Sequence, residues 1–96
     1  MLNVKKYLPI GTVVQLKGAY RKAMIDSYLV RDNNRKEDVF DYGGVLFPEG
    51  LSDSNRIFMF DHTQISKVIF MGLEDEEEKK FVEKLDDIRL KFENES

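Results

Sequence analysis

His62 is the only imidazole in the chain, so any acid–base or metal chemistry that needs imidazole must use it. Asp61 is its neighbour in sequence, and Asp26 or Asp41 could approach it in the fold. One histidine with scattered carboxylates lacks the ligand spacing of a transition-metal site. His62 also falls inside a short capped turn, where an exposed polar side chain is ordinary. We therefore predict no catalytic residue, no metal and no cofactor.

Two further motifs could do chemistry, but each has a structural explanation. The pair Gly43-Gly44 lies between two strand-like segments and lacks the context of a nucleotide-binding loop, so it indicates a β-bulge or a strongly curved strand. The acidic run Glu74–Glu78 lacks the spacing of an EF-hand. Acidic residues are favoured in the first turn of a helix, and the run is typical of one.

Composition restricts the class of protein. The chain has 96 residues, no cysteine and a net charge of −3, which fits one small globular domain without disulfides. A net negative charge makes nucleic-acid binding improbable, because the basic residues do not form one large patch. Residues 1–7 lack the apolar core of a signal peptide, and no apolar run is long enough to span a membrane. We expect a cytoplasmic protein without a membrane partner.

Hydropathy patterns predict an α+β domain spanning residues 1–96, with a curved antiparallel sheet over about 8–71 and a helix over about 73–92. Alternation and β-branched residues indicate five strands, at 10–16, 23–30, 39–47, 57–60 and 66–71. Asp61 and Gln64 predict one capped helical turn before the last strand. The fifth strand is apolar on both faces, which is typical of a strand covered by a helix. The sequence leaves open whether the sheet curls into a barrel.

The C-terminal helix is the longest element, and its apolar stripe predicts how it packs. Phe81, Leu85, Ile88 and Phe92 share one face, which we expect to lie on the sheet. Glu74, Glu77 and Glu78 project along the same stripe, and carboxylates are not buried without partners. The first two turns should therefore extend beyond the sheet, with Leu90 exposed on the opposite face.

Four stretches resemble a known bacterial family: residues 8–18, the block from Phe40 to Gly50 with its Pro48-Glu49-Gly50 turn, residues 60–62, and residues 68–72 leading into the acidic helix start. The chain is similar to the domain-of-unknown-function family 4176, short Firmicutes proteins encoded near type VII secretion and LXG toxin genes. The resemblance implies an accessory role, as a cytoplasmic adaptor or chaperone for secreted LXG toxins, and a protein partner from the same locus.

The leading hypothesis is a non-enzymatic protein-interaction module that uses edge-strand addition or helix docking. A homodimer is compatible with it, and a toxin-neutralising immunity protein is a variant of it. The alternatives are an enzyme or small-ligand sensor built around His62, and a nucleic-acid-binding regulator that aligns Lys17, Arg21, Lys22, Arg31 and Arg35. The predicted interaction residues are Asp41, Tyr42, Gly43, Gly44, Pro48, Glu49, Gly50, Glu74, Glu77, Glu78 and Leu90.

Overall fold

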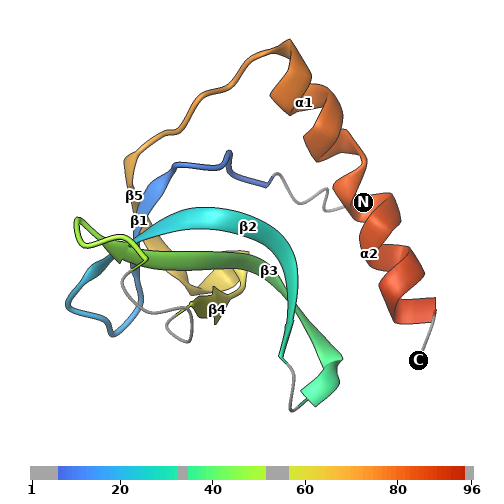
Figure 1. The fold of residues 1–96 in the computed structure, drawn as a ribbon, viewed down its shortest axis with the longest axis horizontal. Coiled ribbons are helices and arrows are strands. Elements are labelled where there is room, and N and C mark those ends of the chain that lie inside the picture. The colour runs from blue at the N-terminus through green and yellow to red at the C-terminus, as the bar shows by residue number, and fades with distance from the viewer. Residues whose placement is uncertain (1–6, 33–34, 52–56, 95–96) are drawn as a thin grey trace.

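The computed structural model describes residues 7–32, 35–51 and 57–94, and has an antiparallel sheet with a helical C-terminus (Figure 1). The five strands are ordered β4-β3-β2-β1-β5, so β4 and β5 are the edges of a sheet that does not close on itself. This confirms the predicted α+β class. The elements are β1 (Val13–Leu16), β2 (Lys22–Asp32), β3 (Arg35–Phe47), β4 (Phe58–Phe60), the short 3-10 helix η1 (His62–Gln64), β5 (Ile65–Phe70), α1 (Glu76–Glu83) and α2 (Leu85–Asn94).

The long, curved β2–β3 hairpin forms the centre of the sheet (Figure 1). Its register shifts where Ile25 pairs with Gly44 and Ser27 pairs with Gly43, so Asp26 is the extra residue of a bulge. A methyl group on Gly44 would lie 2.7 Å from the carbonyl oxygen of Met24. The glycine pair therefore lets two backbones approach closely, and the predicted irregularity lies on the opposing strand.

The segment preceding β1 is held against the sheet by tyrosines. The backbone NH of Leu8 donates to the hydroxyl of Tyr42 at 3.0 Å, and the hydroxyl of Tyr28 donates to the carbonyl of Leu8 at 2.6 Å. The ring of Tyr7 packs edge-on against both of these rings, with centroids 6.0 Å apart. Tyr7 and Tyr42 belong to the buried core, and Tyr28 packs against it.

The first strand begins later than predicted. A turn closes from Pro9 to the backbone NH of Thr12, and Gly11 takes a φ of +91° there. A left-handed residue interrupts extended backbone, so pairing in β1 begins only at Val13. Ile10, which the predicted strand included, therefore precedes β1 and is exposed.

The C-terminal helix is shorter at its start and divided in two. Asp75 accepts a hydrogen bond from the backbone NH of Glu78 at 2.8 Å and so caps α1, which leaves Leu73 and Glu74 outside the helix. At Lys84 the backbone NH bonds to Phe81, a 3-10-type contact that separates α1 from α2. The predicted single helix from residue 73 was wrong on both points.

The predicted packing stripe is confirmed for α2 and only partly for α1. Leu85 is buried in the core, and Ile88 and Phe92 are partly buried against it. Phe81 is half-exposed, and its ring centroid lies 5.9 Å from that of the partly buried Tyr28. α1 extends past the sheet (Figure 1). Within the described residues, no helix is long and apolar enough to cross a lipid bilayer.

Candidate interaction surfaces

Asp41 is the centre of a buried polar cluster between β3, η1 and α2. Its carboxylate accepts from the backbone NH of His62 at 2.8 Å and from Nη1 of Arg89 at 2.6 Å. Its own backbone NH donates to the Asp61 carboxylate at 3.1 Å, and Nη2 of Arg89 donates to the carbonyl of Val39 at 2.9 Å. This buried carboxylate is therefore compensated by hydrogen bonds and by a cation.

Arg89 is the residue that sequence reasoning missed. Burial, the largest single effect, disfavours its charged form, but the Asp41 carboxylate together with Tyr7 and Asp61 more than offsets it, so the pKa of Arg89 is raised. Arg89 follows Leu85 by four residues, which places both on one face of the helix. That spacing, together with an aspartate in an apolar strand, was the available signal.

His62 is tied into the same cluster through Tyr42. The Tyr42 hydroxyl lies 2.7 Å from Nδ1 of His62, and burial raises the pKa of Tyr42 above its usual value. Asp41 meets the backbone of His62, whereas Asp26 lines a different surface. The shallow hollow beside His62 contains neither aspartate among its described lining residues.

Four of the predicted interaction residues are buried and need correction. Asp41 and Tyr42 are 0% exposed, and Gly43 and Gly44 are also buried. They are buried because β2, η1 and α2 pack around this part of β3. A partner could not contact these residues unless this part of the domain unfolded.

The rest of the predicted β3 surface is accessible. Pro48 and Glu49 are exposed and Gly50 is half-buried, in a turn where the Gly50 backbone NH donates to Leu46. Arg21 donates to the Glu49 carboxylate, and this hydrogen bond lowers the pKa of Glu49. Of the helical predictions, Glu74, Glu77 and Leu90 are exposed and Glu78 is half-buried.

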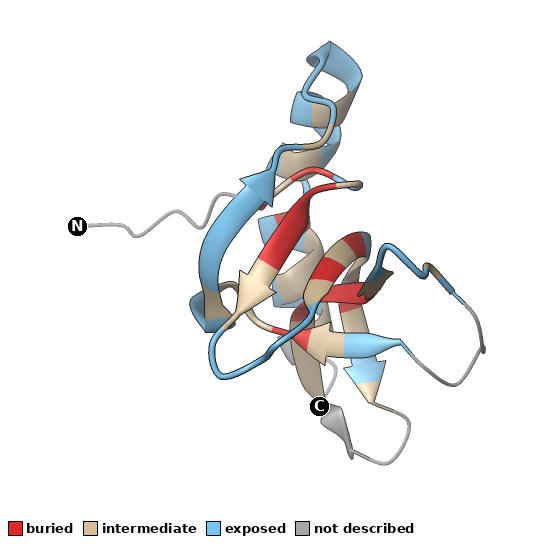
Figure 2. Ribbon diagram, turned by 90° about the vertical axis from the view of Figure 1, so that its left-hand side faces the viewer, coloured by how far each residue is buried: buried red, intermediate tan, exposed pale blue. Residues whose placement is uncertain are grey.

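β5 is the most exposed apolar element. It pairs with β1 on one side and is an edge of the sheet on the other, and Figure 2 shows it as the pale blue strand beside the partly red β1. Val68, Ile69, Phe70 and the following Met71 are all exposed, with Phe70 at 62%. The expectation that a helix covers this strand was wrong, because the helices pack on the β2–β3 side instead.

The apolar surface of β5 continues onto the outer face of the sheet. A hollow of about 340 Å³ there is lined by Met24 and Phe47 together with Ile69 and Phe70 of β5. Lys22 is the only charged residue among those described at this hollow, and its ammonium lies 5.9 Å from the Phe47 ring centroid. The exposed residues of the β5 edge, Val68 to Met71, therefore form one continuous apolar region with Met24 and Phe47 on the face of the sheet. We call this region the β5 surface.

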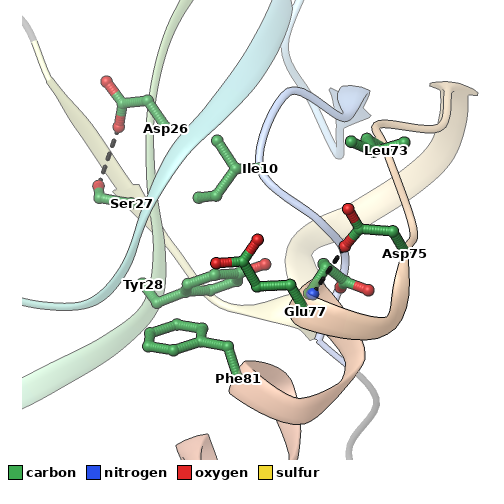
Figure 3. Close-up of a pocket in the computed structure, with 9 residues that line it drawn as sticks. Ile10, Asp26, Ser27, Tyr28, Leu73, Asp75, Glu77 and Phe81 are labelled. Carbon is green, nitrogen blue, oxygen red and sulfur yellow. Dashed lines mark hydrogen bonds between the residues drawn. The ribbon is translucent and has the colours of Figure 1, made fainter.

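A second hollow of about 660 Å³ opens between β2 and the start of α1, and we call it the acidic groove (Figure 3). Its apolar lining comes from Ile10, Tyr28, Leu73 and Phe81. Ser27 and four carboxylate residues complete the described lining: Asp26, Asp75, Glu77 and Glu78. The predicted overhang of Glu77 and Glu78 places them here, whereas Glu74 and Leu90 are not part of this lining.

Among the described residues, the predicted basic residues Lys17, Arg21 and Arg31 lie apart from one another. Arg21 pairs with Glu49, and the Arg31 guanidinium stacks 4.6 Å from the Phe92 ring centroid. Lys17 lies in the turn after β1, at the opposite end of β2 from Arg31. Contacts within the domain thus occupy two of the cations that the nucleic-acid hypothesis requires.

Comparison with known families identifies the chain. The profile of the Domain of unknown function (DUF4176) matches residues 7–81. The chain belongs to the DUF4176 family. The match covers all five strands and the start of α1, so it includes both the β5 surface and the acidic groove. No curated protein and no solved structure matches the chain.

Proposed function

We propose that this DUF4176 protein is a non-enzymatic protein-interaction module that binds a segment of its partner by strand addition at β5. The observation that supports the proposal is an edge strand that exposes Val68, Ile69 and Phe70, followed by the exposed Met71. Edge strands of soluble proteins are usually protected by charges, proline or a covering element. Between Ile65 and Met71 the only charged residue is Lys67.

Strand addition would both pair the free backbone groups of the β5 edge and cover its apolar side chains. The partner's backbone would pair with the outer NH and carbonyl groups of β5, and its alternating side chains would cover the apolar residues on the two faces. The hollow between Phe47 and Phe70 offers a place for one large apolar side chain of the partner. Such an anchor in an apolar pocket supplies much of the energy of many interfaces.

We propose further that the partner is encoded in a type VII secretion locus, and that the protein acts in the cytoplasm as an adaptor or chaperone for LXG toxins. This part rests on the family resemblance described above. An uncovered apolar edge is the kind of surface that a partner expressed with the protein would be expected to shield.

Co-purification tests the proposal. The tagged chain is co-expressed with its genomic neighbours, alongside the double variant Ile69→Lys, Phe70→Lys. Charges at the edge oppose pairing and desolvation, so the double variant should lose the bound neighbour while remaining folded by circular dichroism. Tyr20→Lys is the control, because Tyr20 is 100% exposed in the turn between β1 and β2 and does not line the hollow beside Phe70.

Two results would refute the proposal. One is that no neighbour binds the native chain. The other is that a folded double variant retains its partner as fully as the Tyr20 control, which would place binding elsewhere.

A further inference from the structure

The acidic groove exposes apolar side chains that come from distant parts of the sequence. Leu73, just before α1, is 73% exposed, and Ile10 and Phe81 are about half-exposed. Figure 3 shows them around one hollow, where the aromatic rings of Tyr28 and Phe81 lie next to each other. Three such side chains around one hollow differ from the scattered exposed leucines of an ordinary surface.

Carboxylates surround these apolar groups. Asp26 is contributed by the bulge of β2, while Asp75, Glu77 and Glu78 are contributed by the start of α1. No lysine, arginine or histidine is among the groove's described lining residues. Burial raises the pKa of Tyr28 to about 12, and the nearby Glu78 charge adds to the shift. A hollow with apolar walls and one sign of charge concentrates its electric field on oppositely charged ligands.

The shape and charge of the groove together define what it can bind. A small cation alone would leave Leu73 and Phe81 in water, and in the described part of the chain no three acidic or histidine side chains are grouped as a metal ligand set. An apolar segment alone would bury carboxylates without compensation. We infer that the acidic groove binds a short segment of a protein partner that carries lysine or arginine next to a large apolar side chain.

This inference deepens the proposed function, since it rests on the chain binding protein, but it concerns a surface separate from β5. The two surfaces share no described lining residue. A partner could therefore place one segment along β5 and another in the groove, and each contact can be removed without the other.

Peptide titration tests the inference on the full chain. Three synthetic 14-residue peptides of equal length are used: one combines leucines with lysines, one has the lysines replaced by glutamates, and one has the leucines replaced by serines. Binding is followed by ¹⁵N chemical shifts. Only the first peptide should bind well, and it should shift the amides of Asp26, Tyr28, Leu73 and Phe81.

Matched variants then separate the groove from net charge. Asp26→Asn with Glu77→Gln removes two groove carboxylates, and Glu76→Gln with Glu83→Gln removes two exposed carboxylates of α1 that do not line the groove. The groove variant should weaken binding at least about tenfold and the control less than about twofold, because only close charge pairs give strong coupling. Leu73→Ser should weaken binding as well.

Equal weakening in both double variants, or shifts outside the groove, would overturn the inference. The Ile69→Lys, Phe70→Lys variant should bind the peptide normally. If this β5 variant binds the peptide and also still co-purifies with the neighbour, the strand-addition proposal is refuted and the groove inference is supported. If the peptide does not bind the native chain but the β5 variant loses the neighbour, the groove inference is refuted and strand addition is supported.

Discussion

Charged residues are usually exposed and large apolar residues usually buried, but the Asp41 cluster and the β5 surface each show the opposite. Asp41 is charged and fully buried, whereas Phe70 is aromatic and mostly exposed. The buried carboxylate is held by Arg89 and by backbone NH groups, so its cost is offset inside the chain. The described part of the chain has nothing that covers the β5 side chains, so their exposure is what a binding surface requires.

The largest expected effect comes from breaking the Asp41 cluster. Asp41→Ala removes the carboxylate that compensates the partly buried Arg89 guanidinium and orients η1. We expect a loss of about 3–5 kcal/mol in the free energy of unfolding, measured by urea denaturation. Combining it with Arg89→Met should recover part of the loss, because no uncompensated charge remains. Strictly additive losses would mean that the pair contributes no coupling.

The apolar side of the interior should respond strongly as well. Leu85 is 1% exposed, and Leu85→Ala should cost about 2–5 kcal/mol of unfolding free energy because it leaves a cavity in the core. Leu90 is 56% exposed on the same helix, and Leu90→Ala should change stability by less than about 0.5 kcal/mol. Similar losses at the two positions would contradict the orientation of α2.

The tyrosines that hold residue 8 predict a loss of stability in alkali. The pKa of Tyr28 is about 12 in the folded chain, against an ordinary value near 10. Below pH 10 both states keep the proton, so stability is unaffected. As the pH rises from about 10 to 12 the unfolded state loses protons first, and stability falls. Tyr28→Phe should flatten this fall in denaturation curves, whereas Tyr20→Phe should not, since Tyr20 is fully exposed.

The smallest expected effect is at the β5 surface. Phe70→Ala removes a side chain that is already mostly in water, so the isolated chain should lose no more than about 0.5 kcal/mol. The same substitution should weaken partner binding, because the proposed interface buries the ring. A large loss of stability in the isolated chain would show that Phe70 is part of the core and would remove the contrast.

Strand positions and the packing stripe of α2 could be predicted because they follow from alternation and from helical spacing. Ala23, Ile25 and Leu29 of the predicted second strand are buried in the core, and the predicted Asp61–Gln64 turn forms as η1, with the Gln64 side chain accepting from the Asp61 NH at 2.8 Å. Between the predicted strands, residues 33–34 and 52–56 lie outside the described residues.

The exposure of β5, the burial of Asp41 and the acidic groove could not be predicted, because they depend on the order of the strands and on contacts between residues far apart in sequence. An apolar strand such as β5 reads the same whether it is central or at an edge, so its exposure followed only from the order β4-β3-β2-β1-β5. Burial of Asp41 depends on Arg89, which lies 48 residues away in sequence. The acidic groove joins Asp26 to α1, and it requires both the bulge of β2 and the start of α1 at Glu76.

Hydrogen exchange in the free chain and in the complex with its co-purified neighbour tests the central claim most directly. Binding by strand addition should slow the exchange of amides in residues 65–71, while amides around Asp41 and Tyr42, already buried, should stay unchanged. If the complex forms and residues 65–71 exchange as fast as in the free chain, the β5 edge is not the binding site.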